Sequence, residues 1–444
     1  MPPAAADPSP TVATPTGTEA ATVPEPDGND LVLDVERLVA GGEGLARRPD
    51  QPVVFVRGAL PGERVTARVV DRRKGWQRAE LTGVLVASPA RVGPPCPAVA
   101  AGCGGCDLQH AAPEAQPGLK AATVVDGLVR LGHVAEPHVV VGPSLAPTGF
   151  RTTVRAAVVD GRAGFRRHHS HDVVVVDHCL VAHPWVDQIL TDGFFGPARE
   201  VTVRVGAATG EGLVVVSPSA AGVVVPNDQA ARSVGPASLA VVGTDELSGG
   251  HRAWIHEEVA GRRWRISALS FFQTRPDGAA ALAEAVVRAV GADLAGARVV
   301  DAYSGVGLLA GSLFGLGSSL VGGEPASVVA VERSKSAVAD ARVNLADLID
   351  HGAARVVRSD LDGWNPSRAD VVVADPARAG LGRRATEVLD RTGASVVVLV
   401  SCDAASLGRD AALLEAAGFR FEQAELVDLF PQSHHVEVVS RFRR

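Results

Sequence analysis

The sequence lacks any run of about 18 uncharged apolar residues, so we expect no transmembrane helix. Residues 1–30 contain no lysine, no arginine and no apolar block, and therefore lack the charged and hydrophobic regions of a secretion signal. We expect a cytoplasmic protein that does not bind membranes. The net charge of −7 argues against a protein that coats nucleic acid indiscriminately, but it is compatible with binding through a local basic patch.

Cysteine is also scarce in this chain. The five cysteines are an odd number and the expected compartment is reducing, so a disulfide framework is not expected. Three of them, Cys96, Cys103 and Cys106, are crowded in a stretch rich in glycine and proline, and Cys179 can complete a four-cysteine site. Four thiolates suit zinc and a [4Fe–4S] cluster equally well by ligand count.

The length and composition indicate several folded domains. A chain of 444 residues is too long for one ordinary domain, and its 46% hydrophobic residues allow large buried cores. Residues 1–29 are rich in proline, alanine and threonine, a composition that cannot offset the entropy of ordering, so we predict a disordered tail. We divide the remainder into segments 30–88, 89–270 and 271–444.

Segment 30–88 has the pattern of a small OB-like β-barrel. Short stretches of alternating apolar residues are separated by turns rich in glycine and proline. From Arg57 to Glu80 there are seven basic and three acidic residues, a net charge of +4. Trp76 lies within this basic run and is a candidate for stacking on a base. The segment predicts RNA contact, and the alternative is an ordinary solvated barrel face.

Segment 89–270 is predicted to be a β-rich central domain that carries the cysteine site. A helix is expected over about 119–132, and the stretch from 150 to about 270 is mostly β-like, with valine runs at 173–176 and 213–216. Basic residues gather near Cys179, where they form either an RNA-facing surface or a solvated hairpin. They are Arg162, Arg166, Arg167, His168, His169 and His171.

Segment 271–444 alternates strands and helices, which predicts a parallel, doubly wound α/β sheet. Helices are expected after a tight glycine turn at 304–307 and over about 334–348, 383–391 and 404–417. Ligands of such sheets bind at the carboxyl ends of the strands. The predicted buried strands are 298–303, 328–332, 370–375 and 395–400.

Two acidic residues stand where this sheet would hold a nucleoside. Glu332 ends the second strand opposite the turn at Gly305, a placement that suits the two hydroxyls of a ribose. The alternative for Glu332 is a surface carboxylate that caps a helix. Asp375 ends a later strand and is followed by a proline, which keeps its carboxylate at the ligand-binding edge. The lysine of a phosphate-binding loop is missing, so a P-loop is excluded.

Cys402 lies directly after the strand at 395–400 and before a helix. The dipole of a helix favours a thiolate at its N-terminus, so this position is compatible with a nucleophile whose pKa is lowered. A lone cysteine is equally compatible with a buried, small hydrophobic residue. The residues around it leave both interpretations open.

Several motifs together resemble the RNA uridine C5-methyltransferase family, which uses S-adenosylmethionine. The barrel resembles the RNA-binding TRAM module of that family, and the cysteine cluster resembles its iron–sulfur site. The resemblance covers everything except the tail, and the motifs occur in family order. They are Phe271-Phe-Gln273, Asp301-Ala-Tyr-Ser-Gly-Val-Gly307, Asp375-Pro-Ala-Arg-Ala-Gly380, Val400-Ser-Cys-Asp403 and Phe430-Pro-Gln-Ser-His-His-Val-Glu437.

The resemblance implies a class I, Rossmann-like methyltransferase domain and a role for each matched residue. Cys402 would be the nucleophile, and Glu437 would be the base that removes the C5 proton. A [4Fe–4S] cluster would be held by Cys96, Cys103, Cys106 and Cys179. S-adenosylmethionine would be contacted by Gln273, Tyr303, Glu332 and Asp375, with Asp360 near the adenine.

The proposed chemistry agrees with these residue types. Addition of a thiolate at C6 makes C5 of uracil nucleophilic, and a base must then take the C5 proton before the cysteine can leave. Alternation predicts that His435 and Glu437 share one face of a strand. The chain departs from the family at Ser304 and at Asp403-Ala404, and Asp403 is expected to oppose the thiolate of Cys402.

The target is less defined than the reaction. Family analogy favours 23S ribosomal RNA over transfer RNA, and the sequence does not identify the uridine. The rivals are a methyltransferase of cytosine or of DNA, and a catalytically weak RNA-binding protein that retains the fold. We expect a monomer without an obligate protein partner.

Overall fold

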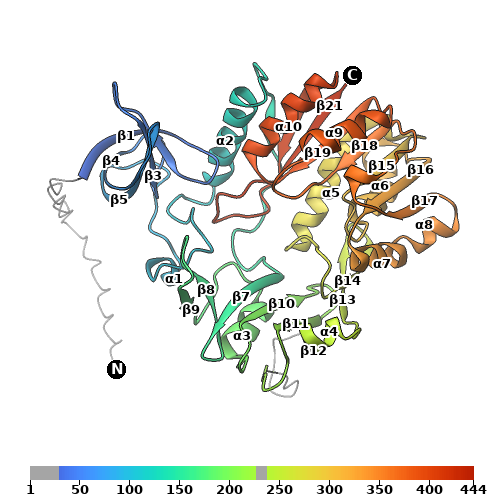
Figure 1. The fold of residues 1–444 in the computed structure, drawn as a ribbon, viewed down its shortest axis with the longest axis horizontal. Helices are drawn as coiled ribbons and strands as arrows, with labels where there is room; N and C mark the ends of the chain where they lie inside the picture. Colours follow the sequence, from blue (N-terminus) through green and yellow to red (C-terminus); the bar gives the residue numbers. More distant parts are fainter. Residues whose placement is uncertain (1–29, 227–237) are drawn as a thin grey trace, which may run out of the picture.

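The structure is a computed structural model that describes residues 30–226 and 238–444 (Figure 1). The predicted disordered tail at 1–29 lies outside the described residues. Within the described part, no helix is long and apolar enough to cross a membrane. The chain forms a barrel, a middle β-rich part and a large α/β part, which are coloured blue, green and yellow to red.

The N-terminal part is a closed five-stranded barrel in the order β1-β2-β3-β5-β4, which confirms the predicted fold of segment 30–88. Alternate residues such as Leu33, Val54 and Val65 point inward and form its core. Trp76 is half-buried, with Phe55 at 6.2 Å and the Arg78 guanidinium 5.4 Å from its ring. The strands are β1 (Asp30–Leu38), β2 (Gly44–Ala46), β3 (Val53–Arg57), β4 (Arg64–Arg72) and β5 (Trp76–Val86).

The middle part contains a six-stranded sheet in the order β12-β11-β10-β7-β8-β9 and a separate hairpin of β13 and β14. Its helices are α1 (Pro97–Ala100), α3 (Pro184–Asp192) and α4 (Thr244–Ser248). Its strands are β7 (Thr153–Val159), β8 (Arg162–Arg166), β9 (Val173–Val175), β10 (Glu200–Val205), β11 (Glu211–Ser217), β12 (Ser238–Gly243), β13 (Trp254–Val259) and β14 (Arg262–Ser267).

The C-terminal part is an eight-stranded sheet in the order β17-β16-β15-β18-β19-β21-β20-β6. The five strands from β15 to β19 are parallel, and β21 runs antiparallel between β19 and β20. The four predicted strands correspond to β15, β16, β18 and β19. The strands are β6 (Val139–Val141), β15 (Arg298–Ala302), β16 (Ser327–Glu332), β17 (Ala354–Arg358), β18 (Val371–Ala374), β19 (Val396–Ser401), β20 (Arg420–Leu426) and β21 (Val438–Arg443).

Helices cover both faces of this sheet, as the alternating strand residues require. Val299 of β15 packs in the core with α5, α6 and α7, whereas the next residue, Val300, packs with α2, α9 and α10. This arrangement confirms the predicted doubly wound fold. The helices are α2 (Gln116–Arg130), α5 (Pro276–Val290), α6 (Leu308–Val321), α7 (Lys335–Asn344), α8 (Ala346–Asp350), α9 (Gly382–Arg391) and α10 (Ala404–Ala416), with short 3-10 turns at η2 (Gly291–Leu294) and η3 (Leu361–Gly363).

Two elements of segment 89–270 pack on the C-terminal sheet and not on the middle one. Strand β6 pairs with β20, and α2 lies against α10. The helices approach so closely that a Cβ on Gly127 would collide with the backbone of Ala404. The segment that carries the cysteines is therefore bound to the sheet that carries Cys402.

Candidate active site

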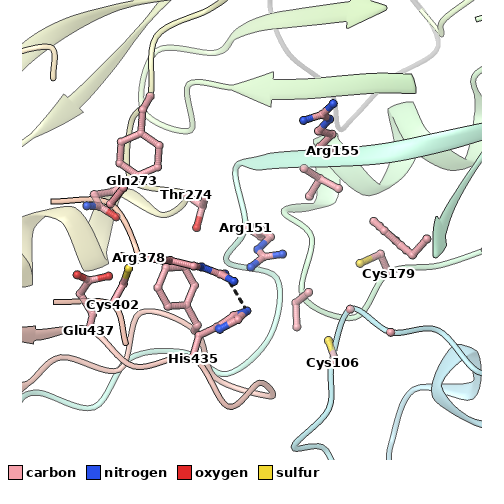
Figure 2. Close-up of a pocket in the computed structure, with 18 of the residues that line it drawn as sticks. Cys106, Arg151, Arg155, Cys179, Gln273, Thr274, Arg378, Cys402, His435 and Glu437 are labelled. Carbon is pink, nitrogen blue, oxygen red and sulfur yellow. Dashed lines mark hydrogen bonds between the residues drawn. The ribbon is translucent and has the colours of Figure 1, made fainter. Parts of the chain in front are cut away.

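One cavity of about 850 Å³ lies at the carboxyl ends of the parallel strands. It brings together all but one of the predicted site residues, although they come from all along the chain after the barrel. Figure 2 shows Cys402, Glu437 and Gln273 at one end and Cys106 and Cys179 at the other. The predicted residues that line the cavity are Cys96, Cys103, Cys106, Cys179, Gln273, Tyr303, Glu332, Asp375, Cys402 and Glu437.

The nucleoside end of the cavity is built by the turn after β15 and the end of β16. The carboxylate of Glu332 accepts hydrogen bonds from the Gly305 N–H at 3.0 Å and from the Ser334 N–H at 2.6 Å. These bonds fix the carboxylate at the turn, and each oxygen keeps a lone pair for a hydroxyl group. Tyr303 has a positive φ of 64°, and burial raises the pKa of its hydroxyl to about 12.

Asp375 lines this end of the cavity, and Asp301 is fully buried close to it without lining the cavity. Burial raises the pKa of Asp301 to about 8 and that of Asp375 to about 7. Asp301 accepts a hydrogen bond from the Ala310 N–H at 2.9 Å, which fixes the helix that follows the glycine turn. A bound cation would favour the ionised forms of both groups, so the site suits a positively charged cofactor. Asp301 was not among the predicted site residues, although it begins one of the matched motifs.

Asp360 is the predicted residue that does not line the cavity. It caps the 3-10 turn η3, where its carboxylate accepts a hydrogen bond from the Asp362 N–H at 3.2 Å, and its side chain is 61% exposed. Arg333 lies 3.8 Å from it. Its contact with the adenine stays a prediction.

Cys402 and Glu437 are placed by neighbouring strands. Cys402 directly follows β19 and Glu437 directly precedes β21. The prediction that His435 and Glu437 share a strand face was wrong, because residues 427–437 form an irregular loop between β20 and β21. This loop nevertheless brings both side chains to the cavity. Glu437 is only 3% exposed, and burial, reinforced by Asp375, raises its pKa well above the usual value.

Of the two interpretations that the sequence left open for Cys402, the lowered pKa is not found. Burial raises its pKa to about 11, and the negative charges of Glu437 and Asp375 act in the same direction. Arg378 opposes them and favours the thiolate. Asp403 directs its carboxylate to the start of α10, where it accepts a hydrogen bond from the Ser406 N–H at 2.7 Å.

Arg378 and His435 form a pair beside the cysteine. His435 was predicted to share a face with Glu437, whereas Arg378 was given no role in the site. Arg378 Nη2 donates a hydrogen bond to His435 Nε2 at 3.2 Å, drawn as a dashed line in Figure 2. Burial, followed by the positive charges of His434 and Arg378, lowers the pKa of His435 to about 4, so a neutral ring accepts the bond. Both residues lie within motifs that match the family, so the motifs could have indicated that both belong to the site.

The four remaining cysteines line the other end of the cavity as free thiols. Burial, with the nearby thiols of Cys179 and Cys103, raises the pKa of Cys106 to about 12. Gly104 lies so close to β8 that a Cβ would stand 2.8 Å from Arg166 O. In the part of the chain that the structure describes, no three His, Cys, Asp or Glu side chains are grouped so as to hold a metal ion. An assembled iron–sulfur site is therefore not shown.

Two buried donors accompany these thiols. Gln109 and Arg151 line the same end of the cavity. Within residues 30–226 and 238–444, neither Gln109 Nε2 nor Arg151 Nε has a partner of good hydrogen-bond geometry, although the Gln109 side chain lies close enough to the Cys106 thiol to act against the rise of its pKa. Unpartnered buried donors are costly, and an anionic group between them and the thiols would satisfy them. The donors are compatible with a thiolate-ligated, negatively charged cluster.

Known proteins resemble this chain both in the barrel and over nearly its whole length. Residues 28–82 match the TRAM domain. The chain is 34% identical to an uncharacterized RNA methyltransferase of Streptomyces avermitilis, over 93% of this chain and 98% of that protein. It is 32% identical to the 23S rRNA (uracil(1939)-C(5))-methyltransferase RlmD of Acidithiobacillus ferrooxidans, over 92% of this chain and 96% of that protein.

A solved structure supports the fold over nearly the whole chain. The crystal structure of Pyrococcus abyssi tRNA (uracil-54, C5)-methyltransferase in complex with S-adenosyl-L-homocysteine superimposes with a TM-score of 0.67. The match covers 93% of this chain and 100% of that one at 23% identity. Together with the near full-length relatives, these matches show that the chain belongs to the S-adenosylmethionine-dependent RNA uracil C5-methyltransferase family.

Proposed function

We propose that this enzyme methylates C5 of one uridine in structured RNA through a covalent bond between Cys402 and C6 of the base. The observation that carries the proposal is that the thiol of Cys402 and the buried carboxyl group of Glu437 lie side by side. They share one cavity with Glu332 and Asp375, the two carboxylates proposed to bind the cofactor. A nucleophile and a proton acceptor at one site are what C5 methylation requires. Burial and Asp375 raise the pKa of Glu437, so its proton-accepting, ionised form is the one that a positively charged cofactor beside Asp375 would favour.

The reaction runs in three steps at these side chains. The thiolate of Cys402 forms a bond to C6, and the electron pair of the C5=C6 bond moves toward C5 and the adjacent carbonyl. C5 then forms a bond to the methyl group that S-adenosylmethionine would supply, the methyl–sulfur bond breaks, and its electrons stay with S-adenosylhomocysteine as the leaving group. Glu437 then accepts the C5 proton, the electrons of that C–H bond restore C5=C6, and Cys402 leaves as a thiolate.

The charged groups around Cys402 control when it reacts. Its raised pKa favours the protonated thiol when no cofactor is bound, because a thiolate would lie beside the carboxylates of Glu437 and Asp375. A positively charged cofactor bound near Asp375 and Glu332 would favour ionisation of the Cys402 thiol, and the charge of Arg378 acts in the same direction. In this proposal Gln273, Tyr303, Glu332 and Asp375 hold the cofactor. A charged cofactor therefore prepares the nucleophile that uses it.

Cys96, Cys103, Cys106 and Cys179 are proposed to hold a [4Fe–4S] cluster. The number and kind of donors fit such a cluster, and the unpartnered donors of Gln109 and Arg151 fit its negative charge. The cluster would have a structural role: it would link the loop at 96–106 to the loop around Cys179 at one end of the cavity. Glu437 and Cys402 suffice for the methylation itself.

The proposed substrate is a uridine of 23S ribosomal RNA, bound by a single copy of the enzyme. The relative from Acidithiobacillus ferrooxidans, with which this chain shares nearly its full length, acts on that RNA by its name. The exposed basic residues Arg72, Arg73 and Lys74 at the β4–β5 turn are suited to hold the phosphates around the target. The target base must leave its stack to reach Cys402.

The substrate is tested by mapping 5-methyluridine in RNA from cells with the enzyme, without it, and with the Cys402→Ala variant. One uridine of 23S ribosomal RNA is expected to lose its methyl group in the last two. Loss confined to transfer RNA would change the target and leave the chemistry intact. Loss of a methylcytosine, or no loss at all, would contradict the proposed reaction.

A further inference from the structure

The loop that carries Glu437 is held in place by a distant part of the chain. Residues 427–437, the catalytic loop, have no regular structure. The Val427 N–H donates to Glu437 O at 2.8 Å and joins the two ends of the loop, and the other hydrogen bonds within it are short-range, such as those from Ser433 to Phe430 O. Among the described residues, the loop is hydrogen-bonded to other parts of the chain by Arg378, which bonds His435, and by residues 107–120, which we call the clamp. The clamp comprises the end of the cysteine segment and the first turns of α2.

The centre of the clamp is a pair of buried glutamines. Gln116 Nε2 donates to Gln432 Oε1 at 3.2 Å, and the Gln432 N–H donates back to Gln116 Oε1 at 2.7 Å. The Leu108 N–H donates to Gln432 O at 3.0 Å. Gln432 has a left-handed φ of 69°, so the loop adopts a backbone conformation that depends on these outside partners.

An ion pair fixes the start of the catalytic loop. Lys120 Nζ donates to Asp428 Oδ1 at 2.6 Å and to Phe430 O at 2.9 Å. The side chains of Lys120 and Asp428 are 2% and 8% exposed. Removal of one partner from such a pair leaves a buried charge without compensation, so the pair also contributes to folding.

The end of the loop nearest to Glu437 is fixed by Asp107. The His434 N–H donates to Asp107 Oδ1 at 2.8 Å, and His434 Nδ1 contacts Asp107 Oδ2. His434 precedes His435 and Glu437 by one and three residues, and Asp107 directly follows Cys106. A single carboxylate thus joins the cysteine segment to the backbone that leads into the proposed base.

We infer that Asp107 and Gln116 are positioning residues that hold the catalytic loop so that Glu437 reaches the C5 proton, and that they transmit disturbance of the cysteine segment to Glu437. The inference rests on the proposed role of Glu437. Neither residue lines the cavity, so they act through the loop. Loosening the loop slows removal of the C5 proton, whereas cofactor binding at Glu332 is unaffected.

The test compares Asp107→Ala, which removes both acceptors, with Asp107→Asn, which retains an acceptor for the His434 N–H. Asp126→Ala is the matched control, because Asp126 is another half-buried acidic residue of the same region whose carboxylate pairs with Arg37 at 3.1 Å and Arg130 at 3.6 Å. Gln116→Leu is a second variant at the other anchor.

Hydrogen exchange of the full-length protein reads the loop directly. The amides of Gln432 and His434 should exchange faster in Asp107→Ala and Gln116→Leu, and the C-terminal sheet should exchange as in the parent protein. Cys106→Ser should also speed exchange of the loop. Unchanged exchange in Asp107→Ala would overturn the clamp, and unchanged exchange in Cys106→Ser would overturn the link to the cysteine segment.

Turnover with RNA reads the affected step. In Asp107→Ala, kcat should fall by up to about 100-fold, as misplacement of a reacting group does. Covalent methylated RNA–protein adduct should accumulate, the KM for S-adenosylmethionine should stay the same, and Asp107→Asn should recover most of the rate. If Glu437→Gln stalls with RNA attached but Asp107→Ala releases RNA normally, the clamp is contradicted and the proposed base is not. Normal release by Glu437→Gln would instead contradict the proposed base.

Discussion

Cys402 and Glu437 face each other because they are the next residues beyond the last paired step of β19 and β21. In that step Ser401 pairs with Val438, and the strands run antiparallel, so Cys402 leaves one strand where Glu437 enters the other. The register of two strands thus fixes the nucleophile beside the proposed base. Because the two groups are close, the negative charge of Glu437 helps to raise the pKa of the Cys402 thiol.

Removal of Arg378 should make Cys402 less reactive. Arg378 lowers the pKa of the thiol, so Arg378→Ala should raise the pKa further and reduce the thiolate fraction at any given pH. Alkylation of Cys402 by iodoacetamide, followed by mass spectrometry of its peptide, should slow, and its pH profile should move to higher pH. Arg383→Ala, at an exposed arginine of α9, is the control. An unchanged profile would mean that Arg378 does not act on the thiol.

Substitution of Glu332 should weaken cofactor binding. Glu332→Ala removes the proposed acceptor of the ribose hydroxyls and frees the Gly305 N–H that the carboxylate fixes. Calorimetry should show a loss of about 1.5–3 kcal/mol in S-adenosylmethionine binding, the range of hydrogen bonds to charged groups. Glu387→Ala, at an exposed position of α9, should bind normally. Equal affinities in the two variants would place the ribose elsewhere.

Anaerobically purified protein should be brown and contain about four iron atoms per chain, as expected for a [4Fe–4S] cluster. Cys106→Ala should lose the iron, because it removes one of the four proposed ligands. Cys402→Ala provides a close control, since it deletes the fifth cysteine and should keep the full iron content. Stoichiometric zinc in the parent protein would show that the site holds a different metal.

The barrel should contribute RNA affinity without affecting the cofactor. Replacement of Arg72, Arg73 and Lys74 by glutamine should weaken RNA binding and flatten its dependence on salt, because fewer counterions are released. Binding of S-adenosylmethionine should be unchanged. Glutamine at Arg383, Arg384 and Arg391, three exposed arginines on α9, controls for loss of charge. If both triple variants lost the same affinity, the barrel would have no special role.

The parallel strands and the cofactor end of the site were predictable because their signals are local. An apolar run that ends in a glycine turn, as at Gly305, specifies a strand, a turn and a helix within a few residues. Glu332 and Asp375 could be placed by the same logic, since the carboxyl ends of parallel strands share one edge. The position of Cys402 followed from the strand before it.

The rest depends on contacts between distant segments. The partners Gln116 and Gln432 are 316 residues apart in the sequence, and no local sequence pattern predicts that they are in contact. Strand β6 was missed because three exposed or half-buried valines form a strand only when β20 is available to pair with them. The pKa of Cys402 stayed open because helix position is local, whereas burial and the carboxyl groups of Asp375 and Glu437 come from the tertiary structure.

The covalent mechanism is tested most directly by where each catalytic variant stops. Glu437→Gln keeps the thiol but lacks a carboxylate base, so it should attack C6, transfer the methyl group and then stall. A denaturing gel with radiolabelled cofactor should show a labelled, slowly migrating protein–RNA band for this variant. Cys402→Ala should show no band, and neither variant should release methylated RNA. Full turnover by Glu437→Gln, or a covalent band in Cys402→Ala, would contradict the mechanism.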